Sequence, residues 1–337
     1  TVPQTHAANQ TINISSGKVL GGTSSVNGLV WVRGNKEEYD AIEALGNKGW
    51  DWDLFYAAMK QSEAFKMPSA VQVEELGFTV NPSSLGTSGP VEVSFPNYLP
   101  LQHQKFIAAS KQLGHEFNSD PYSGDNRGIF YINPIVSRTN LFVLYDGALV
   151  TKFDTTMSPG PGTVAPQLAE ATAVEVCFPD NTVQLAKPKS SIGEIILCAG
   201  SIRTPQILEL SGIGDKNVLS PLGIETKVDL PGVGANYEDH VITILTFKLK
   251  EPYLSFDALA YDPAVKAEQE ALYKEGKGWL AFANCVFNMV PTDKILAPEE
   301  ISVAEEILKT KPPTIHEDLY NSIKDQVFTV PQAEYLL

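Results

Sequence analysis

The amino-acid sequence predicts a mixed α/β fold, α+β overall, with a β-meander packed on a larger sheet. Three observations predict it. Short runs of alternating apolar residues lie close together at 141–198, separated by tight turns. The apolar spacing changes to that of a helix at Ile202–Leu210, directly after Ala199-Gly200, which makes a strand–glycine–helix unit. Segments with helical character lie on either side, at 37–63 and 262–275.

The first hundred residues predict helices between loops. Residues 17–34 are rich in Gly, Ser and Thr around a short apolar core and lead into the helical segment at 37–63. Within that segment Asp51 or Asp53 can begin a second helix, because a carboxylate accepts hydrogen bonds from the N–H groups of a first turn. Residues 66–100 contain many Pro, Gly and Ser, which predicts mostly extended loop.

The rest of the chain predicts strands, a helix and a mixed module. Five strands are expected, at 141–144, 149–153, 173–178, 182–186 and 194–198. The helix that follows ends before Gly212, a natural C-cap. Paired glycines at 232–234 suit a boundary between modules, and beyond them we expect an extended run at 241–249, the charged amphipathic helix at 262–275 and an acidic helix past Pro298.

Composition limits the classes of function. The chain has 337 residues, of which 43% are hydrophobic and 19% charged. This excludes a disordered tail, a collagen-like repeat and a small disulfide scaffold, and the length suggests about two domains. The formal net charge is −15, so the surface repels phosphate backbones and no nucleic-acid partner is expected. No apolar run approaches the roughly 20 residues that cross a bilayer, so no membrane partner is expected either.

Cysteines and sequons bear on the cellular compartment. Cys177, Cys198 and Cys285 have no CxxC or zinc-ligand spacing, so no metal is expected, and apolar surroundings predict buried, inert thiols. Asn9 and Asn13 each begin an N-x-S/T sequon, which favours an extracellular (secreted) protein that is N-glycosylated at one of them. The chain begins without an initiator Met or a signal peptide, so we expect a processed or partial product.

The segment Gly17–Gly28 is the most informative. Its consecutive glycines, Gly21 and Gly22, let main-chain N–H groups approach an anionic or planar ligand closely, and the hydroxyls that follow add donors. That is the chemistry of a cofactor cradle, although a plain surface loop shares the composition. The apolar flanks Val19-Leu20 and 29–32 favour a buried, packed loop. The segment lacks the Gly-Lys-Ser/Thr ending of a P-loop, and GxGxxG occurs nowhere in the chain.

A second segment, Gly200–Gly214, follows an apolar run and opens a helix. The N–H groups and dipole of a helix N-terminus favour an anion. An ordinary strand–helix corner explains these residues equally well.

Together the two segments resemble, position by position, the signature patterns of the glucose-methanol-choline (GMC) family of flavin oxidoreductases, nearest to the fungal aryl-alcohol oxidase and glucose oxidase types. The first pattern runs from Gly17 to Asp40 and the second from Gly200 to Gly214. Other segments match the family in the right order along most of the chain: 49–52, 122–128, 232–236 and Asp239-His240.

The resemblance implies a fold, a cofactor and an activity. The fold would be a partial FAD-binding Rossmann-like domain with the β-meander, plus part of an antiparallel-sheet substrate domain. The cofactor would be FAD. The activity would oxidise the CH–OH group of an alcohol or sugar by hydride transfer to flavin, so the partners would be that small-molecule substrate and an electron acceptor such as oxygen.

The resemblance also implies residues that hold the cofactor. Along the FAD diphosphate it implies Gly21, Gly22 and Thr23; near the isoalloxazine ring, Asn27, Gly28 and Leu29; and at the adenine, the main chain of Val150. It implies three regions: an FAD-covering and FAD-interface region at 1–100, an FAD-binding portion with the meander at 101–232, and a partial substrate-binding domain at 233–337.

The sequence departs from the family pattern in three places. Members begin with a βαβ unit that bears GxGxxG and end with a catalytic His paired with a His or an Asn, and we find neither here. A helical stretch that members carry between Ile132-Asn133-Pro134 and Ser137-Arg138 is also missing. No catalytic residue is therefore assigned among the five histidines. A catalytically silent fragment or binding remnant, or a non-redox family member, remains an alternative function.

Overall fold

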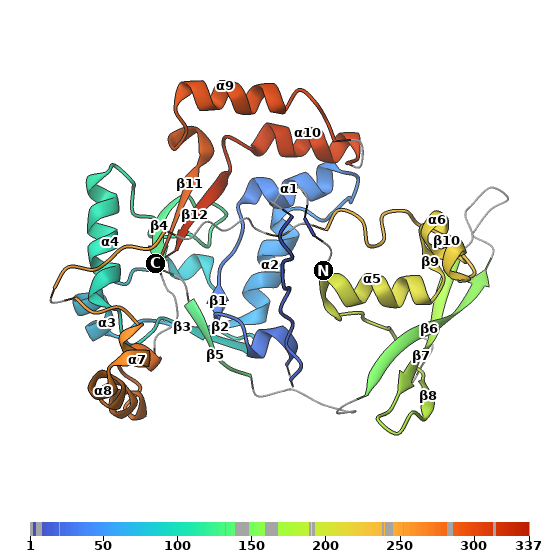
Figure 1. The fold of residues 1–337 in the computed structure, drawn as a ribbon, viewed down its shortest axis with the longest axis horizontal. Helices are drawn as coiled ribbons and strands as arrows, with labels where there is room; N and C mark the ends of the chain where they lie inside the picture. Colours follow the sequence, from blue (N-terminus) through green and yellow to red (C-terminus); the bar gives the residue numbers. More distant parts are fainter. Residues whose placement is uncertain are drawn as a thin grey trace. The chain divides into compact units, whose positions relative to one another are not determined.

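The structure is a computed structural model, and it describes residues 3–4, 9–19, 21–131, 133–138, 148–158, 168–188, 190, 193–237, 239, 245–251, 253–281, 286–312 and 315–336. The chain forms two compact units (Figure 1). Unit 1 comprises Thr1–Phe142 and Thr246–Leu337, and unit 2 comprises Val143–Leu245. The mixture of helices and sheets confirms the predicted fold class. The three-region division into 1–100, 101–232 and 233–337 stays a prediction.

Unit 1 holds two sheets. The first has the order β1-β5-β3-β2, in which only β2 and β3 are parallel. The second has the antiparallel order β12-β11-β4. The strands of these sheets are β1 (Val30–Trp31), β2 (Glu63–Lys66), β3 (Val91–Ser94), β4 (Gly128–Tyr131), β5 (Asn133–Arg138), β11 (Val286–Pro291) and β12 (Pro331–Leu336).

The helices of unit 1 begin where the local sequence supplies a cap. Asp51 accepts a hydrogen bond from the Leu54 N–H at 2.9 Å, which confirms one of the two predicted caps. Ser69 and Gln72 form a capping box, so a helix lies inside the segment expected to be mostly loop. The helices are α1 (Lys36–Ala44), α2 (Trp52–Ser62), α3 (Ala70–Leu76), α4 (Leu101–Gln112), α7 (Ala258–Tyr261), α8 (Pro263–Lys274), α9 (Pro298–Ile307) and α10 (Glu317–Gln326).

Aromatic and aliphatic side chains form the core of unit 1. The rings of Phe78 and Phe95 stack with their centroids 4.5 Å apart, and Phe65 meets Phe95 edge-on at 5.7 Å. Nine buried residues form this cluster: Phe65, Phe78, Leu85, Val93, Phe95, Leu99, Ile107, Tyr122 and Val286. The core joins residues from both halves of the discontinuous unit, because Val286 lies far along the chain from the other eight.

Unit 2 contains the predicted meander. Strands β6 (Leu149–Ser158), β7 (Leu168–Cys177) and β8 (Val183–Ala186) form an antiparallel sheet in chain order, which confirms three of the expected strands. Helix α5 (Gly200–Leu210) confirms the expected helix. The short elements that follow are β9 (Ile213–Gly214), α6 (Lys216–Leu219) and β10 (Val228–Asp229), and β9 pairs with β10 in parallel.

The strand expected at 194–198 does not form. No strand is assigned within 194–198, and Ile196 there is 75% exposed. Cys198 is exposed as well and Cys177 is half-buried, so neither is the buried thiol expected. A β-strand needs a neighbour for its N–H and C=O groups, and no strand of the described residues pairs with this segment. The extended run expected at 241–249 is described only at 245–249, which belongs to neither a helix nor a strand, so this expectation stays a prediction. Residues 141–144, 241–244 and Cys285 lie outside the described residues.

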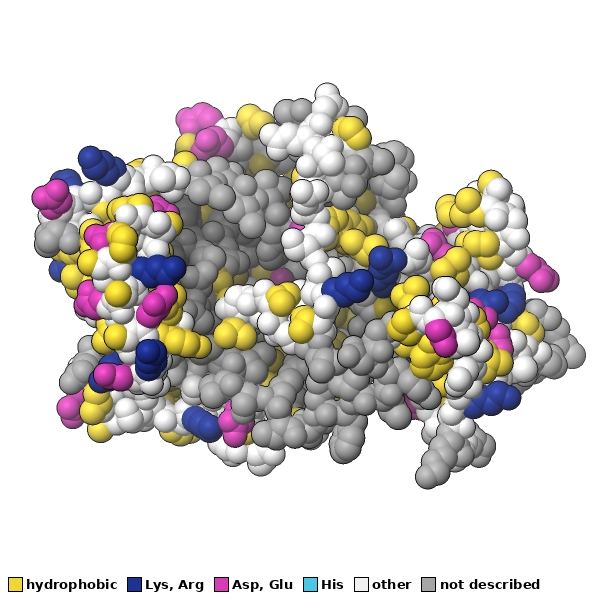
Figure 2. All heavy atoms as spheres, turned by 60° about the horizontal axis from the view of Figure 1, so that its bottom comes forward, with side chains coloured by type: hydrophobic (Ala, Val, Ile, Leu, Met, Phe, Trp, Pro, Cys, Tyr) yellow, Lys and Arg dark blue, Asp and Glu magenta, His cyan; other side chains and the backbone are white. Residues whose placement is uncertain are grey.

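The surface carries many apolar side chains. On the face drawn in Figure 2, hydrophobic side chains lie among acidic and basic ones. Seven large apolar side chains of the described residues are at least two-thirds exposed: Leu113, Ile196, Leu222, Leu245, Phe247, Tyr261 and Ile307. Among the residues that the structure describes, no helix combines the length and the apolar character that a membrane span requires.

Candidate functional site

The glycine-rich loop of unit 1 is a tight turn that glycine makes possible. Gly21 and Gly22 adopt φ of 88° and 60°, in the left-handed region. They lead into a 3-10 turn, η1 (Gly22–Ser25), in which the Gly22 N–H donates to the Val19 carbonyl at 2.8 Å. A Cβ on Gly21 would lie 2.3 Å from Ser25 Oγ, whereas one on Gly22 would meet nothing within 4 Å. The loop therefore needs glycine at 21 for its shape and presents open backbone at 22.

Hydroxyl groups hold the turn together from within. The Gly17 N–H donates to Thr23 Oγ1 at 3.1 Å, and Ser24 Oγ donates to the Gly21 carbonyl at 2.6 Å. The hydroxyls that the sequence suggested as ligand donors thus also fix the loop. Thr23 remains exposed.

The second half of the loop carries a strained residue. Leu29 has φ of 60°, a conformation that non-glycine residues adopt rarely and at a cost of about 1–3 kcal/mol. Its N–H donates to Asn27 Oδ1 at 3.0 Å, which closes an Asx turn. A Cβ on Gly28, between them, would meet nothing within 4 Å. The main chain of Asn27–Leu29 is thereby held in one shape and left accessible.

The loop is exposed, which corrects the prediction of a buried, packed loop. Val26 is 61% exposed and Leu29 is 38% exposed, and Val19 and Val32 are exposed as well. These apolar side chains, which lie near Gly22 and Gly28, are therefore not covered by the described part of unit 1. Such a surface suits a planar ligand or another polypeptide segment that would cover it. Leu20 lies outside the described residues.

A buried ion pair lies just after the loop. Arg33 is 3% exposed and its Nη2 lies 2.6 Å from Oε1 of Glu63, which is fully buried. Arg33 Nη1 also donates to the carbonyls of Ser84 (2.7 Å) and Tyr122 (2.8 Å). Arg33 lies inside the first sequence pattern, Gly17 to Asp40, but Glu63 lies outside it and the sequence analysis missed it. The only local signal for Glu63 is a carboxylate at the end of an apolar helix, directly before Ala64-Phe65.

Asp40, the last residue of the first pattern, connects two helices. Its Oδ2 lies 2.5 Å from Lys36 Nζ, and its Oδ1 accepts the Trp52 N–H at 3.1 Å. The hydrogen bond from Lys36 is the largest cause that lowers the pKa of Asp40 below its ordinary value. Asp40 therefore links α1 to the start of α2.

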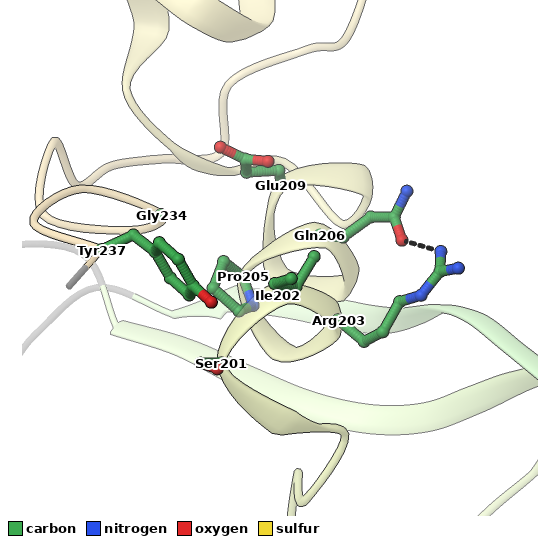
Figure 3. Close-up of a pocket in the computed structure, with 8 residues that line it drawn as sticks. All are labelled: Ser201, Ile202, Arg203, Pro205, Gln206, Glu209, Gly234 and Tyr237. Atoms are coloured by element: carbon green, nitrogen blue, oxygen red, sulfur yellow. Dashed lines mark hydrogen bonds between the residues drawn. The ribbon is translucent and has the colours of Figure 1, made fainter. Parts of the chain in front are cut away.

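The second segment forms a separate hollow in unit 2. Gly200 has φ of 88° and opens α5, and the Ala199 N–H donates to Thr204 Oγ1 at 3.1 Å. A cavity of about 510 Å³ lies between α5 and the loop that follows β10. It is lined by Ser201, Ile202, Arg203, Pro205, Gln206, Glu209, Gly234 and Tyr237. Figure 3 shows the Tyr237 ring beside Pro205, while Arg203 and Gln206 pair with each other at 2.7 Å.

The structure brings six of the seven predicted cofactor residues into one loop. Gly21, Gly22, Thr23, Asn27, Gly28 and Leu29 all lie there in unit 1. Val150 belongs to unit 2, where it is a half-buried residue of β6 opposite Val176 of β7.

The histidines lie in varied surroundings. His103 is a buried residue of α4. His316 caps α10 by accepting the Asp318 N–H at its Nδ1. His6 and His240 lie outside the described residues. Among the residues described, no group of three or more His, Cys, Asp or Glu could hold a metal ion.

The comparisons with known proteins agree on one family. Residues 4–242 match the family described as GMC oxidoreductase, and this chain therefore belongs to the GMC oxidoreductase family. Its members are flavoproteins that depend on FAD.

Several relatives are fungal. A GMC oxidoreductase family protein of Malassezia sympodialis, Mala s 12, is 36% identical over 273 residues, which are 74% of this chain and 42% of that protein. A dehydrogenase of Armillaria gallica is 28% identical over 334 residues, 92% of this chain and 50% of its own length. The chain thus spans about half the length of the curated relatives it matches.

Solved structures share the fold. An FAD-dependent oxidoreductase from Chaetomium thermophilum superposes with a TM-score of 0.80 at 28% identity, over 98% of this chain and 60% of that one. A fungal aryl-alcohol oxidase superposes with a TM-score of 0.76 at 24% identity, over 99% of this chain and 61% of that one. The second likeness concerns the fold alone.

Proposed function

We propose that this chain contributes the flavin-facing loop of an FAD-dependent oxidoreductase that oxidises the CH–OH group of an alcohol or sugar. The observation that carries the proposal is the glycine loop itself, an exposed turn with open backbone at Gly22 and Gly28 inside the segment that matches the family. FAD, when bound, supplies the redox chemistry by accepting a hydride from the substrate carbon. The substrate would be a small alcohol or sugar, and the electrons would pass on to oxygen or another acceptor.

The residues of the loop fit FAD in two respects. Around Gly21, Gly22 and Thr23 the backbone turns sharply without side-chain bulk, as a diphosphate that approaches main-chain N–H groups requires. At Asn27–Leu29 the backbone is held by the Asx turn and is exposed beside apolar side chains, as the edge of a planar ring system requires. On this proposal the protein binds and orients the flavin, and the main chain of Val150 contacts the adenine.

The test is direct binding of FAD by the purified chain. We expect a visible flavin spectrum and saturable binding on titration with FAD. Gly28→Ala is the informative variant. Its new Cβ meets no atom of the chain within 4 Å and its φ is not in the left-handed region, so folding is unaffected. The methyl group would nevertheless occupy the space of the ring and weaken FAD binding about tenfold or more. No yellow colour and no saturable binding by the unsubstituted chain would eliminate the flavoprotein function for these residues.

A catalytically silent piece of such an enzyme, or a non-redox family member, is the second candidate. One observation on the described histidines favours it: His103 is buried on α4, and the Nδ1 of His316 accepts the Asp318 N–H at the start of α10. General acid–base catalysis contributes roughly 10²–10⁴ in rate, so activity would be low without a base. Anaerobic addition of an alcohol to the FAD-loaded chain separates the two candidates. Bleaching of the flavin supports the oxidoreductase, and an unchanged spectrum supports the silent form.

The proposal includes secretion and N-glycosylation. Asn9 and Asn13 are both exposed, and 11–16 around Asn13 is extended and exposed along its length. Expression in a secreting yeast, followed by glycosidase treatment, should shift the mass of the chain, and the shift should disappear when both asparagines are changed to Gln. Secreted chain without any such shift would contradict glycosylation.

A further inference from the structure

Glu63 contacts the strand that leads out of the proposed flavin loop. The side chain is completely buried at the first position of β2. Its Oε2 accepts the Trp31 Nε1–H at 2.8 Å, and its Oε1 accepts Arg33 Nη2 at 2.6 Å and the Gly86 N–H at 2.7 Å. Two of these three donors lie two and four residues past Leu29. A single carboxylate therefore ties the outgoing end of the loop to the core of unit 1.

The backbone hydrogen bonds between β1 and β5 alone would hold the C-terminal end of the loop only weakly. Strand β1 has only two residues, and they pair with Asn133 and Pro134 of β5. Proline has no N–H, so Pro134, opposite Val30, cannot donate to the ladder. Side-chain hydrogen bonds must supply much of the restraint on β1.

The same network also grips the main chain of β1 and of Arg33. Tyr122 Oη donates to the Trp31 carbonyl at 3.4 Å, and Asn126 Nδ2 donates to the Arg33 carbonyl at 3.1 Å. Arg33 in turn is oriented by the carbonyls of Ser84 and Tyr122 and by the ring of Tyr56, whose centroid lies 5.3 Å away. In this low-dielectric setting a charged hydrogen-bond network is directional and stiff.

A restraint on the C-terminal side of the loop helps to keep Leu29 in its unusual backbone conformation. Leu29 holds a left-handed conformation, which persists only where the flanking structure fixes it. On its N-terminal side the Asx turn with Asn27 does so. On its C-terminal side the restraint comes through Trp31, two residues on. Without it, the backbone of Asn27–Leu29 would relax toward ordinary dihedral angles.

We propose that Glu63 is a positioning residue for the flavin loop, acting through Trp31 and Arg33 to hold the main chain of Asn27–Leu29 in its binding shape. Glu63 itself is fully buried, so it would not touch a flavin bound at the exposed loop. The inference rests on the proposed function for the role of the loop, but the anchoring can be measured without FAD.

The first experiment measures backbone hydrogen exchange in the full chain. Trp31→Phe removes the indole donor and keeps the ion pair between Arg33 and Glu63, so it is the variant expected to fold. Glu63→Gln keeps the shape of the side chain and removes its charge. Both should speed exchange across 27–31 about tenfold or more, because the local restraint is lost. Exchange in β3 should change far less.

Tyr320→Phe is the matched control. It removes another hydroxyl hydrogen bond of unit 1, from Tyr320 Oη to the Leu308 carbonyl at 2.9 Å, without touching β1. A loss of general stability would speed exchange in all three variants alike. Unchanged exchange at 27–31 in a folded Trp31→Phe chain overturns the inference, whatever the chain does with FAD.

The second experiment measures FAD binding by the same variants. Trp31→Phe and Glu63→Gln should each weaken binding about tenfold and blur the fine structure of the bound-flavin spectrum, whereas Tyr320→Phe should not. The double variant should bind FAD about as weakly as Glu63→Gln alone, because the hydrogen bond that Trp31→Phe removes is one of those that Glu63→Gln already weakens. Additive losses would overturn the inference. Failure of the unsubstituted chain to bind FAD would instead overturn the proposed function, and the exchange result would still decide the anchoring.

Discussion

At the scale of single residues, Asp40 links the charged side chain of Lys36 to the first residue of α2. Its carboxylate accepts from Lys36 and from the Trp52 N–H, and the Lys36 hydrogen bond is the largest cause that lowers its pKa. Both Lys36 and Asp40 are about half exposed, so solvent screens much of their attraction. The pair therefore stabilises the folded chain only modestly.

We predict that Asp40→Asn lowers the free energy of unfolding by less than about 1 kcal/mol at neutral pH. The pKa of Asp40 is lower in the folded chain than its ordinary value of 3.8. Its contribution is therefore fully present above that value and is lost as the pH falls through the folded pKa. Urea unfolding at about pH 7 and about pH 3 measures this. An equal loss at both values would contradict the prediction, and Lys36→Met should reduce the effect of the substitution.

Gly86 gives a second prediction at this scale. Its N–H donates to Glu63, and a Cβ built on it would lie 1.7 Å from the Lys60 carbonyl oxygen. The end of α2 would have to move, so Gly86→Ala should cost about 1–3 kcal/mol or more of unfolding free energy. Gly232→Ala, where a Cβ meets nothing within 4 Å, should stay within about 0.5 kcal/mol. Similar urea midpoints for the two variants would refute the steric argument.

What the sequence predicts at the residue scale depends on distance along the chain. Asp51 could be identified as a cap because its acceptor role involves Leu54, three residues away. Glu63 could not, because its partner Arg33 lies 30 residues away and meets it only in the folded core. The shape of the glycine loop follows from its own residues, whereas its exposure depends on what packs against it.

At the scale of elements, β8 is an open edge. Among the described strands β8 pairs with β7 alone, and Val183 and Leu185 are about half exposed. An edge strand with apolar side chains offers unpaired N–H and C=O groups to another chain. We therefore expect this strand to promote association between copies.

We predict that Leu185→Lys reduces self-association and leaves the free energy of unfolding within about 0.5 kcal/mol, since little apolar area is buried there. Sedimentation velocity at several concentrations measures the association. Gln184→Lys is the matched control, because it adds the same charge to the strand without removing an apolar side chain. If Leu185→Lys associates as strongly as the unsubstituted chain, another surface is responsible.

Whether an element could be predicted from the sequence also depends on how far apart its interacting residues lie along the chain. The meander could be predicted because its strands alternate locally and meet at a tight turn, where Asn181 adopts φ of 64°. The sheet β1-β5-β3-β2 could not, because its strands come from distant segments and two residues make up β1. The apolar run at 194–198 was predicted as a strand from its composition alone, but pairing decides whether a strand forms.

At the scale of the whole molecule, burial is incomplete. The loop at 17–28 is mostly exposed, and seven large apolar side chains elsewhere among the described residues are at least two-thirds exposed. Each buried methylene group stabilises a fold by about 0.8 kcal/mol, and apolar side chains that stay exposed to water do not add this stabilisation. The net charge of −15 adds self-repulsion to the compact state.

We predict that the isolated chain has marginal stability or aggregates. Thermal unfolding should be broad or irreversible, and light scattering should rise with temperature. Saturating FAD should raise the midpoint, because a ligand that binds only the folded state stabilises it by mass action. A sharp, cooperative and reversible transition of a monomer without FAD would contradict this prediction.

The order of the strands in the second sheet of unit 1 means that β4 is synthesised long before the strand that it pairs with. In unit 1, β11 lies between β4 and β12, yet β4 ends at Tyr131 and β11 begins only at Val286. A ribosome adding about 5–20 residues per second needs on the order of ten seconds to make the stretch between them, which includes all of unit 2. During that time β4 lacks the strand that it pairs with in the finished sheet, so we expect the nascent chain to depend on chaperones at this stage of synthesis.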